Sequence, residues 1–428
     1  MTDHGRPASA RAFERARAVS PGGVHSPVRA FRAVDGPPVF FDRGEGAEVV
    51  DLDGRRLLDT CLSWGPLPLG HAHPAVVEAV REAAGKGLSF GACHAGEAAL
   101  CELILEGFPH HERVRLVSSG TEAVMTALRL ARGVTGRSLV VKYDGGYHGH
   151  LDSLLVSAGS GLATLGVASS AGVPAALAET TLVAPFDDLD ATARLFAEHG
   201  SDIACVALEP LPGNNGLLPQ RREFLAGLRE LCDEHGALLL FDEVISGFRL
   251  RFGGYDAMVD LRPDLTTLGK IVGGGLPIGA VAGRAELMDR LAPEGDVYQA
   301  GTLSGNPVSV AAGTTTLRVL RDEGAHDRLE ELGRRFESAL SGGPSWMQLQ
   351  RQGSLNWLYL SEGELPRRAD AIAEEAITRF TQLHPRMLAE GVYLPPSGYE
   401  LFFLSTAHSE EQVDRLAETL LAQVTALD

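Results

Sequence analysis

Short apolar runs alternate with amphipathic stretches through the middle of the chain, from about residue 60 to residue 315. Five of the runs have the length and the β-branched content of buried strands, at 114–117, 138–142, 203–208, 237–241 and 277–282. Between them, apolar residues recur at helical spacing, for example at 122–132 and 222–235. The alternation predicts an α/β fold, in which a mostly parallel sheet is flanked by helices on both faces.

Beyond about residue 316 the pattern changes. Long charged helices are predicted at 316–341 and 367–390, with short strands at 355–360 and 399–405, a mixture typical of a smaller α+β domain. A further segment, 149–181, is rich in Gly, Ser and Ala and has little periodicity. A stretch of that kind inside a compact domain is usually functional, and we interpret it as a lid or gate.

The bulk composition excludes several classes of protein. A length of 428 residues suits a large core plus a smaller domain. The formal charge of −18 disfavours nucleic acid and anionic membrane as partners. Five cysteines without Cys-x-x-Cys spacing are typical of free thiols in a reducing compartment. No apolar run approaches the ~18 residues of a membrane span, and the Arg- and Ala-rich N-terminus lacks the apolar stretch of a secretory signal. We expect a cytoplasmic protein.

Lys270 carries the main chemical signal. It is one of only three lysines among 38 basic residues, and arginine cannot replace a lysine that must form an imine. Asp242 follows the predicted strand 237–241, at the carboxyl end where catalytic groups of α/β sheets lie. A lysine that holds an aldehyde as an imine and an aspartate that keeps a pyridine nitrogen protonated are what a pyridoxal phosphate enzyme requires. The pair therefore predicts that cofactor.

Other polar motifs have ordinary structural interpretations. Lys86 ends an amphipathic helical run, where a cation suits the helix dipole, and Lys142 ends a strand before a turn. The His-x-His pairs at 71–73 and 148–150 lack a third metal ligand at matching spacing, so we expect no metal site. The glycine run 273–275 lacks the spacing of a dinucleotide-binding loop and is interpreted as a turn.

Residues 118–122, Ser-Ser-Gly-Thr-Glu, lie between a predicted strand and a predicted helix. Small residues there let backbone N–H groups and hydroxyls converge on a phosphate at the positive end of the helix. An ordinary helix N-cap has the same sequence, so the motif alone leaves both interpretations open. Because Asp242 and Lys270 follow it in that order, a phosphate site is favoured.

Further short motifs accompany these residues. They are Ser-Pro-Val-Arg at 26–29, Ser-Trp-Gly-Pro at 63–66, Ser-Phe-Gly-Ala at 89–92, Tyr-His-Gly-His at 147–150, Ala-Gly-Ser-Gly at 158–161, Gly-Asn at 213–214, Asp-Glu-Val at 242–244 and Gln-Ala-Gly-Thr-Leu-Ser-Gly-Asn-Pro at 299–307. Together, from about residue 12 to the end, they resemble the class III aminotransferases, a group of fold-type I pyridoxal phosphate enzymes, and within it the glutamate-1-semialdehyde aminomutase family. The segments at 26–29, 63–66 and 158–161 are the ones more specific to the aminomutases.

The resemblance implies a cofactor site that two subunits share. Lys270 would hold pyridoxal phosphate or pyridoxamine phosphate and move protons, Asp242 would pair with the pyridine nitrogen, and Tyr147 would lie over the ring; these three are the expected catalytic residues. Thr302 would reach the phosphate from the second subunit, so the resemblance implies a homodimer. The expected cofactor-binding residues are Ser119, Gly120, Thr121, Tyr147, Asn214, Asp242, Val244, Lys270 and Thr302.

The resemblance also implies a substrate pocket. Arg29 would bind the substrate carboxylate, and Glu400 would face Arg29 when substrate is absent. The expected substrate-binding residues are Ser26, Arg29, Trp64, Ser160 and Glu400. The implied reaction is an isomerisation: glutamate-1-semialdehyde accepts an amine, and the diamine 4,5-diaminovalerate then gives back its other amine. The product is 5-aminolevulinate, a precursor in porphyrin biosynthesis.

The implied architecture is that of a fold-type I pyridoxal phosphate transferase, with a large domain whose mostly parallel sheet is flanked by helices and a smaller α+β domain. An N-terminal segment, 1–65, would contribute to the small domain and to the substrate site. The large domain, 66–315, would bind the cofactor. The C-terminal small domain would cover 316–428.

The sequence departs from the aminomutase pattern at His25, at Cys93 and in the segments 67–69 and 353–357. None of these positions belongs to the cofactor set. They leave open a related class III aminotransferase that acts on another amino acid. A non-catalytic protein that binds pyridoxal phosphate is the alternative from a different class, and the presence of both Lys270 and Asp242 argues against it.

Overall fold

The computed structural model describes residues 5–156 and 170–427. Its largest sheet has seven strands, in the order β4-β10-β9-β8-β7-β5-β6. Their bounds are β4 Arg113–Val117, β5 Leu139–Tyr143, β6 Thr181–Ala184, β7 Ile203–Leu208, β8 Leu238–Asp242, β9 Leu265–Leu268 and β10 Gly279–Gly283. The strands from β6 to β9 pair in parallel, and β10 is antiparallel to both β9 and β4. The five predicted strands are all present, and the prediction of a mostly parallel sheet is confirmed.

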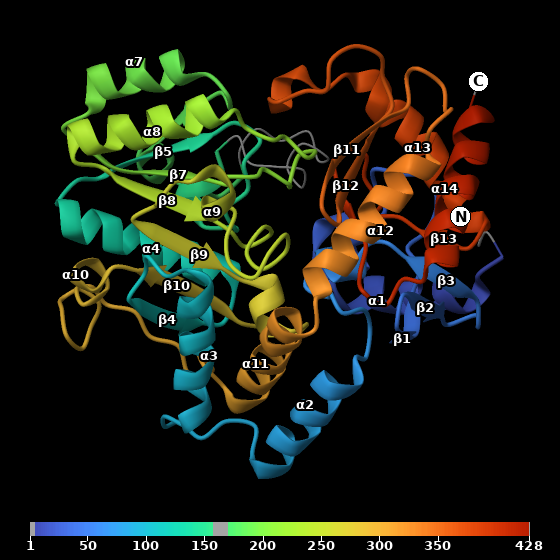
Figure 1. The fold of residues 1–428 in the computed structure, drawn as a ribbon, viewed down its shortest axis with the longest axis horizontal. Coiled ribbons are helices and arrows are strands. Elements are labelled where there is room, and N and C mark those ends of the chain that lie inside the picture. The colour runs from blue at the N-terminus through green and yellow to red at the C-terminus, as the bar shows by residue number, and fades with distance from the viewer. Residues whose placement is uncertain (1–4, 157–169, 428) are drawn as a thin grey trace.

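Helices cover both faces of this sheet, as predicted. Successive residues of β7 point to opposite faces: Val206 and Leu208 pack in one cluster with residues of α8 (Arg222–His235), whereas Cys205 and Ala207 pack in another with residues of α4 (Gly120–Thr135). Figure 1 shows α7 (Leu189–His199) beside α8, across the sheet from α4. In folds of this kind, ligands bind outside the carboxyl ends of the parallel strands.

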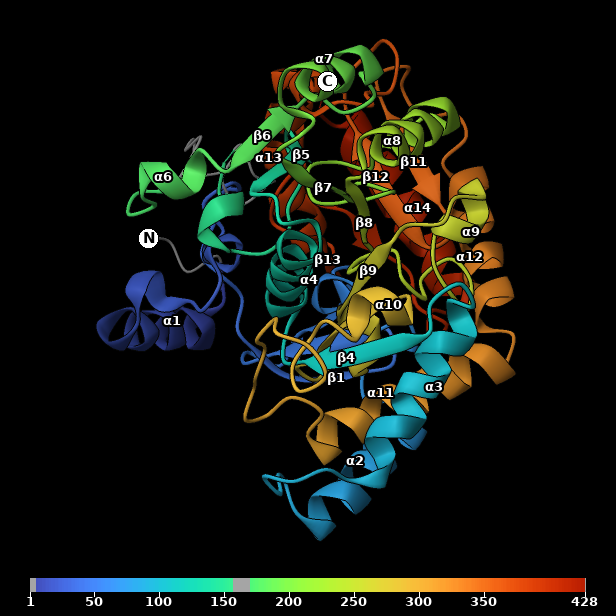
Figure 2. The ribbon, with the colours of Figure 1, turned by 90° about the vertical axis from the view of Figure 1, so that its left-hand side faces the viewer.

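Three further helices pack beside the sheet. α2 (Pro74–Lys86), α3 (Ala95–Gly107) and α11 (Pro307–Asp322) pack together, and α2 projects furthest from the body of the chain (Figure 2). Two short helices, α9 (Asp256–Val259) and α10 (Ala285–Met288), lie in the loops of the same body.

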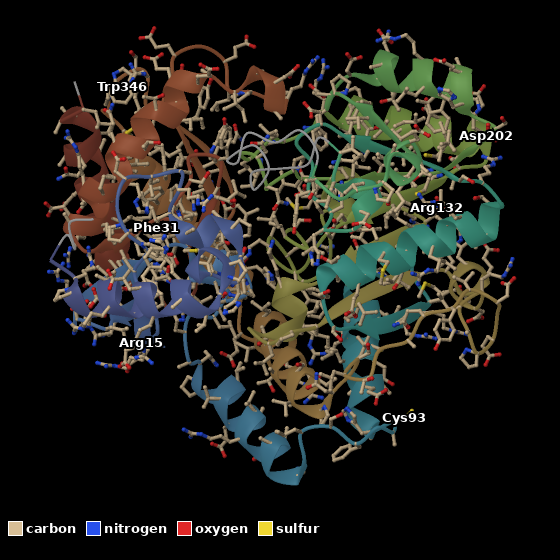
Figure 3. All side chains as sticks on the ribbon, turned by 180° about the vertical axis from the view of Figure 1, so that it is seen from behind. Arg15, Phe31, Cys93, Arg132, Asp202 and Trp346 are labelled. Carbon is tan, nitrogen blue, oxygen red and sulfur yellow. The ribbon has the colours of Figure 1, made fainter. Side chains whose placement is uncertain are left out.

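The second body is built from the N-terminal and the C-terminal segments of the chain. Its elements are α1 Pro7–Val19, β1 Phe41–Glu45, β2 Glu48–Asp51, β3 Arg56–Asp59, β11 Gln348–Gln352, β12 Leu355–Tyr359, β13 Val392–Tyr393, β14 Phe402–Phe403, α12 Ala325–Ala339, α13 Glu374–Ala389 and α14 Glu410–Thr425. Strand β13 pairs with β3, and Phe31 shares a hydrophobic cluster with Trp346, far away in sequence (Figure 3). The predicted role of 1–65 as a part of the small domain therefore has a physical basis in this shared core, while the domain limits themselves stay predictions.

Several predicted elements differ in their extent. The helix predicted at 316–341 is two helices, α11 and α12, because Gly324 adopts a left-handed φ of 64° between them. The helix predicted at 367–390 begins only at Glu374, and the strand predicted at 399–405 is limited to Phe402–Phe403. Of the predicted gate, 157–169 lie outside the described residues; the short helix α6 (Ala175–Ala178) follows. Within the described residues, every helix is too short or too polar to cross a membrane.

Candidate active site

A cavity of about 180 Å³ lies at the carboxyl ends of the parallel strands. It is lined by Ser119, Gly120, Thr121, Tyr147, His148, Gly149, Glu209, Asn214, Asp242, Val244, Ile245 and Lys270. The residues predicted to bind the cofactor from this chain all line it. The sequence did not single out Glu209 or Ile245, and it assigned His148 no more than a place in a turn.

One end of the cavity is the N-terminus of α4. Ser119 is the N-cap residue, and its hydroxyl accepts a hydrogen bond from the N–H of Glu122 at 3.1 Å. Gly120 begins the helix; a Cβ at this position would lie 3.0 Å from the side chain of Val244. A Cβ at Gly149 would collide with Thr121. The glycines therefore keep a concave surface open where the N–H groups of a 16-residue helix point outward. The N-cap interpretation is confirmed, and the phosphate site stays a prediction that this surface suits.

The carboxylate of Asp242 is fixed at the other side. Its Oδ1 accepts hydrogen bonds from the Thr267 hydroxyl at 3.1 Å and from the N–H of Val244 at 3.2 Å. Its Oδ2 lies 2.8 Å from Nδ1 of His148, and both side chains are buried. Three partners from three segments thus hold one carboxylate in one orientation, as is required of a group that must pair with a ring nitrogen.

Lys270 follows β9 at the same edge of the sheet and has a left-handed φ of 46°. Burial lowers the pKa of its ammonium, although the carboxylates of Glu209, Glu400 and Asp242 oppose the shift. The neutral amine is therefore favoured more than in an exposed lysine, and it is the neutral amine that attacks a carbonyl carbon.

Glu209 is a buried carboxylate that orients two predicted site residues. Its Oε1 accepts a hydrogen bond from the N–H of Tyr147 at 3.1 Å. Its Oε2 accepts from the side-chain amide of Asn214 at 2.8 Å and from the N–H of Gly213 at 3.1 Å. Burial raises the pKa of Glu209. One sequence signal could have found it: it directly follows the apolar strand 203–208, as part of the same sheet edge that ends in Asp242.

The predicted substrate residues that the structure describes lie in three separate segments, around 26–29, 64 and 400. Ser26 precedes the short turn Pro27–Ala30, Arg29 lies within it, and Trp64 ends the turn Leu62–Trp64. Burial raises the pKa of the Cys61 thiol well above its usual value; Asp59 and Glu400 raise it further, while Arg29 opposes them. Arg29 and Glu400 therefore act electrostatically on one buried thiol.

The remaining predicted residues do not line the cavity. Thr302 is exposed on the segment before α11, and Ser160 lies outside the described residues. Burial raises the pKa of Tyr147, and the negative charges of Asp242 and then Glu400 add to the rise. The contact between Arg29 and Glu400 stays a prediction.

The other lysines have structural positions. Lys142 is buried, and its ammonium donates hydrogen bonds to the carbonyl groups of Gly146, Leu154 and Val156. Lys86 is exposed at the end of α2. Across residues 5–156 and 170–427, no group of three or more His, Cys, Asp or Glu side chains is placed to hold a metal ion.

Comparison with known proteins gives the family. The family described as aminotransferase class-III matches residues 31–420. A glutamate-1-semialdehyde 2,1-aminomutase from Sorangium cellulosum is 53% identical over 413 residues, which cover 96% of this chain and 94% of that protein. Another with the same name, from Syntrophomonas wolfei, is 50% identical over 412 residues, 95% of each protein.

Solved structures share the whole fold. An omega-transaminase from Sphaerobacter thermophilus has a TM-score of 0.91 at 34% identity, with all of both chains covered. A transaminase with PLP bound has a TM-score of 0.87 at 32% identity and covers 98% of this chain and 97% of its own. A glutamate-1-semialdehyde-aminomutase from Pseudomonas aeruginosa PAO1 has a TM-score of 0.84 at 27% identity, with 98% and 95% covered.

The fold and the site define a fold-type I enzyme that uses pyridoxal phosphate. This chain belongs to the class III aminotransferase family. The donor set of the cavity fits the cofactor: a helix N-terminus for the phosphate, an oriented carboxylate on Asp242 for the ring nitrogen, and the amine of Lys270 for the aldehyde.

Proposed function

We propose that this chain is a glutamate-1-semialdehyde 2,1-aminomutase, which moves an amino group within one molecule and forms 5-aminolevulinate for porphyrin biosynthesis. The observation that carries the proposal is its 50–53% identity, over nearly its whole length, to proteins of that name. The Ser-Pro-Val-Arg segment at 26–29 and the Ser-Trp-Gly-Pro segment at 63–66 support it further.

Each of the cavity residues has a separate role in the proposed reaction. When bound, pyridoxal phosphate supplies an electron sink that stabilises negative charge on the carbon next to the amine. Asp242, fixed by its three partners, keeps the ring nitrogen protonated. Burial lowers the pKa of Lys270, so its amine is more readily neutral, and the amine removes or returns a proton at the substrate carbon that bears the amino group. Glu209 holds Tyr147 and Asn214 at the wall of the cavity.

An aminomutase must also keep its diamine between the two halves of the reaction. The gate predicted at 149–181 would meet this need by excluding water; this part of the proposal rests on composition, since 157–169 lie outside the described residues. Arg29 holds the carboxylate of the substrate throughout, because a guanidinium can bind both carboxylate oxygens. A cytoplasmic location is part of the same proposal, and the five free cysteines support it.

The reaction itself gives the first prediction. Purified protein that contains pyridoxamine phosphate, incubated with glutamate-1-semialdehyde and no other amine donor or acceptor, is expected to form 5-aminolevulinate over many turnovers. An ordinary aminotransferase would stop after one turnover per site, because it needs a second substrate to restore the amine. Accumulation of 5-aminolevulinate in excess of the enzyme concentration is the measurement. A single-turnover burst would favour the related aminotransferase, whose fold the solved transaminases share.

The second prediction concerns the homodimer. Thr302 is exposed and lies outside the cavity, so its proposed contact with the phosphate requires a second subunit. Light scattering of the cofactor-bound protein is expected to give twice the chain mass of 45.4 kDa. Thr302→Val is expected to weaken cofactor retention by roughly three- to tenfold, the effect of one lost hydrogen bond, whereas Thr315→Val, on α11, is the control. A fully active monomer would contradict the proposal.

A further inference from the structure

Arg249 is a buried cation that no carboxylate of the described residues pairs with. Only 1% of the residue is exposed. Its Nη2 donates a hydrogen bond to the carbonyl oxygen of Gly65, while Nε and Nη1 have no hydrogen-bond partner among the described residues. Burial lowers the pKa of this guanidinium to about 9. Burial of a charge without a partner lowers the stability of the fold, and the roles proposed above do not involve Arg249.

The group that Arg249 binds is the end of a strained turn. Leu62, Ser63, Trp64 and Gly65 have φ values of 44°, 58°, 71° and 104°. Three of these residues carry a Cβ, and a left-handed conformation at such residues persists only where the surroundings fix it. At the start of the turn, the carboxylate of Asp59 accepts hydrogen bonds at 2.8 and 3.1 Å from the two N–H groups that enter it. Arg249 fixes the other end.

The same guanidinium lies where the two bodies of the chain meet. Its central carbon is 5.4 Å from the ring centroid of Phe403, in β14 of the second body. A Cβ at Gly65 would lie 3.1 Å from that ring, so the turn is pressed against it. Arg249 itself follows β8 in the first body. The side chain therefore joins the large sheet to the turn that carries Ser63 and Trp64.

Arg249 also acts on the other wall of the site. The loop that carries it packs on β9: a Cβ at Gly247 would lie 2.6 Å from Leu268, just before Lys270. Burial is the main cause of the lowered pKa of Lys270, and the positive charge of Arg249 adds to it. Three carboxylates oppose the shift, those of Glu209, Glu400 and Asp242, so a cation on this side offsets part of their field.

We propose that Arg249 is a positioning residue for the reaction: it fixes the Leu62–Gly65 turn at the substrate pocket, and from a loop packed on β9 its charge acts on Lys270. The assignment of the turn to the substrate pocket rests on the proposed function. The effects on the turn and on the amine do not, so they can be measured whatever substrate the enzyme uses.

The turn is tested by hydrogen exchange of the full-length holoenzyme. Arg249→Met, which keeps much of the volume and removes the charge and the donors, is expected to speed exchange of the amides at 62–66 by roughly tenfold or more. With glutamate-1-semialdehyde as substrate, KM is expected to rise more than kcat falls, with a loss of 10- to 100-fold in kcat/KM. Arg137→Met is the matched control, because Arg137 also binds backbone carbonyls, those of Ile203 and His235, away from the cavity.

The charge is tested on the full-length chain after removal of the cofactor. Acetylation of Lys270 by acetic anhydride is followed against pH by mass spectrometry, with the exposed Lys86 as the internal standard. In Arg249→Met the midpoint of Lys270 labelling is expected to move to higher pH, while in Arg249→Lys and in Arg137→Met it stays. If Arg249→Met fails to fold, Arg249→Lys remains testable, with faster exchange at 62–66 and an unshifted midpoint expected.

Two results would overturn the proposal. In a folded Arg249→Met variant, unchanged exchange at 62–66 together with an unchanged midpoint would show that Arg249 only fills space. A midpoint that moves equally in Arg249→Lys would show that packing, not charge, acts on Lys270. If the parent enzyme did not convert glutamate-1-semialdehyde, the proposed function would fail, and the exchange and labelling results would still decide the role of Arg249.

Discussion

Lys270→Ala is expected to lower kcat with glutamate-1-semialdehyde by at least roughly 10³-fold. The lysine is proposed to act both as the amine that holds the cofactor and as the group that moves protons, and general acid–base catalysis alone contributes about 10²–10⁴-fold. The variant should still fold, because the side chain of Lys270 lines a cavity and fills no core cluster. Single-turnover kinetics with pyridoxamine phosphate added measure the loss of the proton-transfer role by itself.

Chemical mapping tests the assignment of Lys270 as the cofactor-binding lysine without a measurement of the reaction rate. Reduction of the holoenzyme with borohydride, followed by peptide mapping, should place the pyridoxyl group on Lys270. Lys86→Ala is the matched control, since this lysine is exposed at the end of α2, and its activity should equal that of the parent. A pyridoxyl group on Lys142 or Lys86 would contradict the assignment.

The pH dependence has a definite sign. Burial lowers the pKa of Lys270 below the ordinary 10.5, so the amine becomes protonated, and loses its nucleophilicity, only as the pH falls through that lowered value. Between the lowered pKa and 10.5 the unfolded chain binds more protons at this site than the folded chain does. Rising pH in that window therefore stabilises the cofactor-free fold. The stability difference between the parent and Lys270→Ala should show this slope.

The sequence predicted several residues of the candidate site because those residues directly follow strand ends. Asp242 was predicted from an apolar run, and β8 indeed ends on it. His148 and Glu209 were missed as site residues because their roles depend on which strands lie side by side. His148 contacts a carboxylate 94 residues away, and no local pattern encodes that pairing. Glu209 directly follows the apolar strand β7, but only the structure shows that it is buried and holds Tyr147 and Asn214.

The turn at Leu62–Gly65 could not have been predicted from local preference. Leucine, serine and tryptophan disfavour positive φ, and the turn is held by local hydrogen bonds to Asp59 and by the long-range hydrogen bond from Arg249. The break between α11 and α12 did have a local signal, Gly324, which the charged periodicity of 316–341 outweighed. Elements are thus predicted best where local residue preferences and the packing of the core favour the same structure. They are predicted worst at strained positions such as the Leu62–Gly65 turn.

Arg29→Lys is expected to raise KM for glutamate-1-semialdehyde by roughly 10- to 100-fold and to leave the cofactor absorbance unchanged. A guanidinium presents two parallel donors to a carboxylate, which an ammonium cannot do. Hydrogen bonds to charged groups are worth about 1.5–3 kcal/mol, and each 1.4 kcal/mol is a factor of ten. Arg32→Lys is the matched control, because Arg32 is an exposed arginine one turn further along the same segment.

Glu400→Gln tests the other half of the same pair. If Glu400 faces Arg29 while the pocket is empty, its neutral amide should release the guanidinium and admit other amine donors that carry a carboxylate. Glutamate and alanine should then convert the pyridoxal form to the pyridoxamine form faster than in the parent, which the cofactor spectrum records directly. The double variant with Arg29→Lys should lose that gain, because the site that captures the donors is weakened. Parent-like turnover by Arg29→Lys would place the carboxylate site elsewhere, and the aminomutase assignment would then rest on the relatives alone.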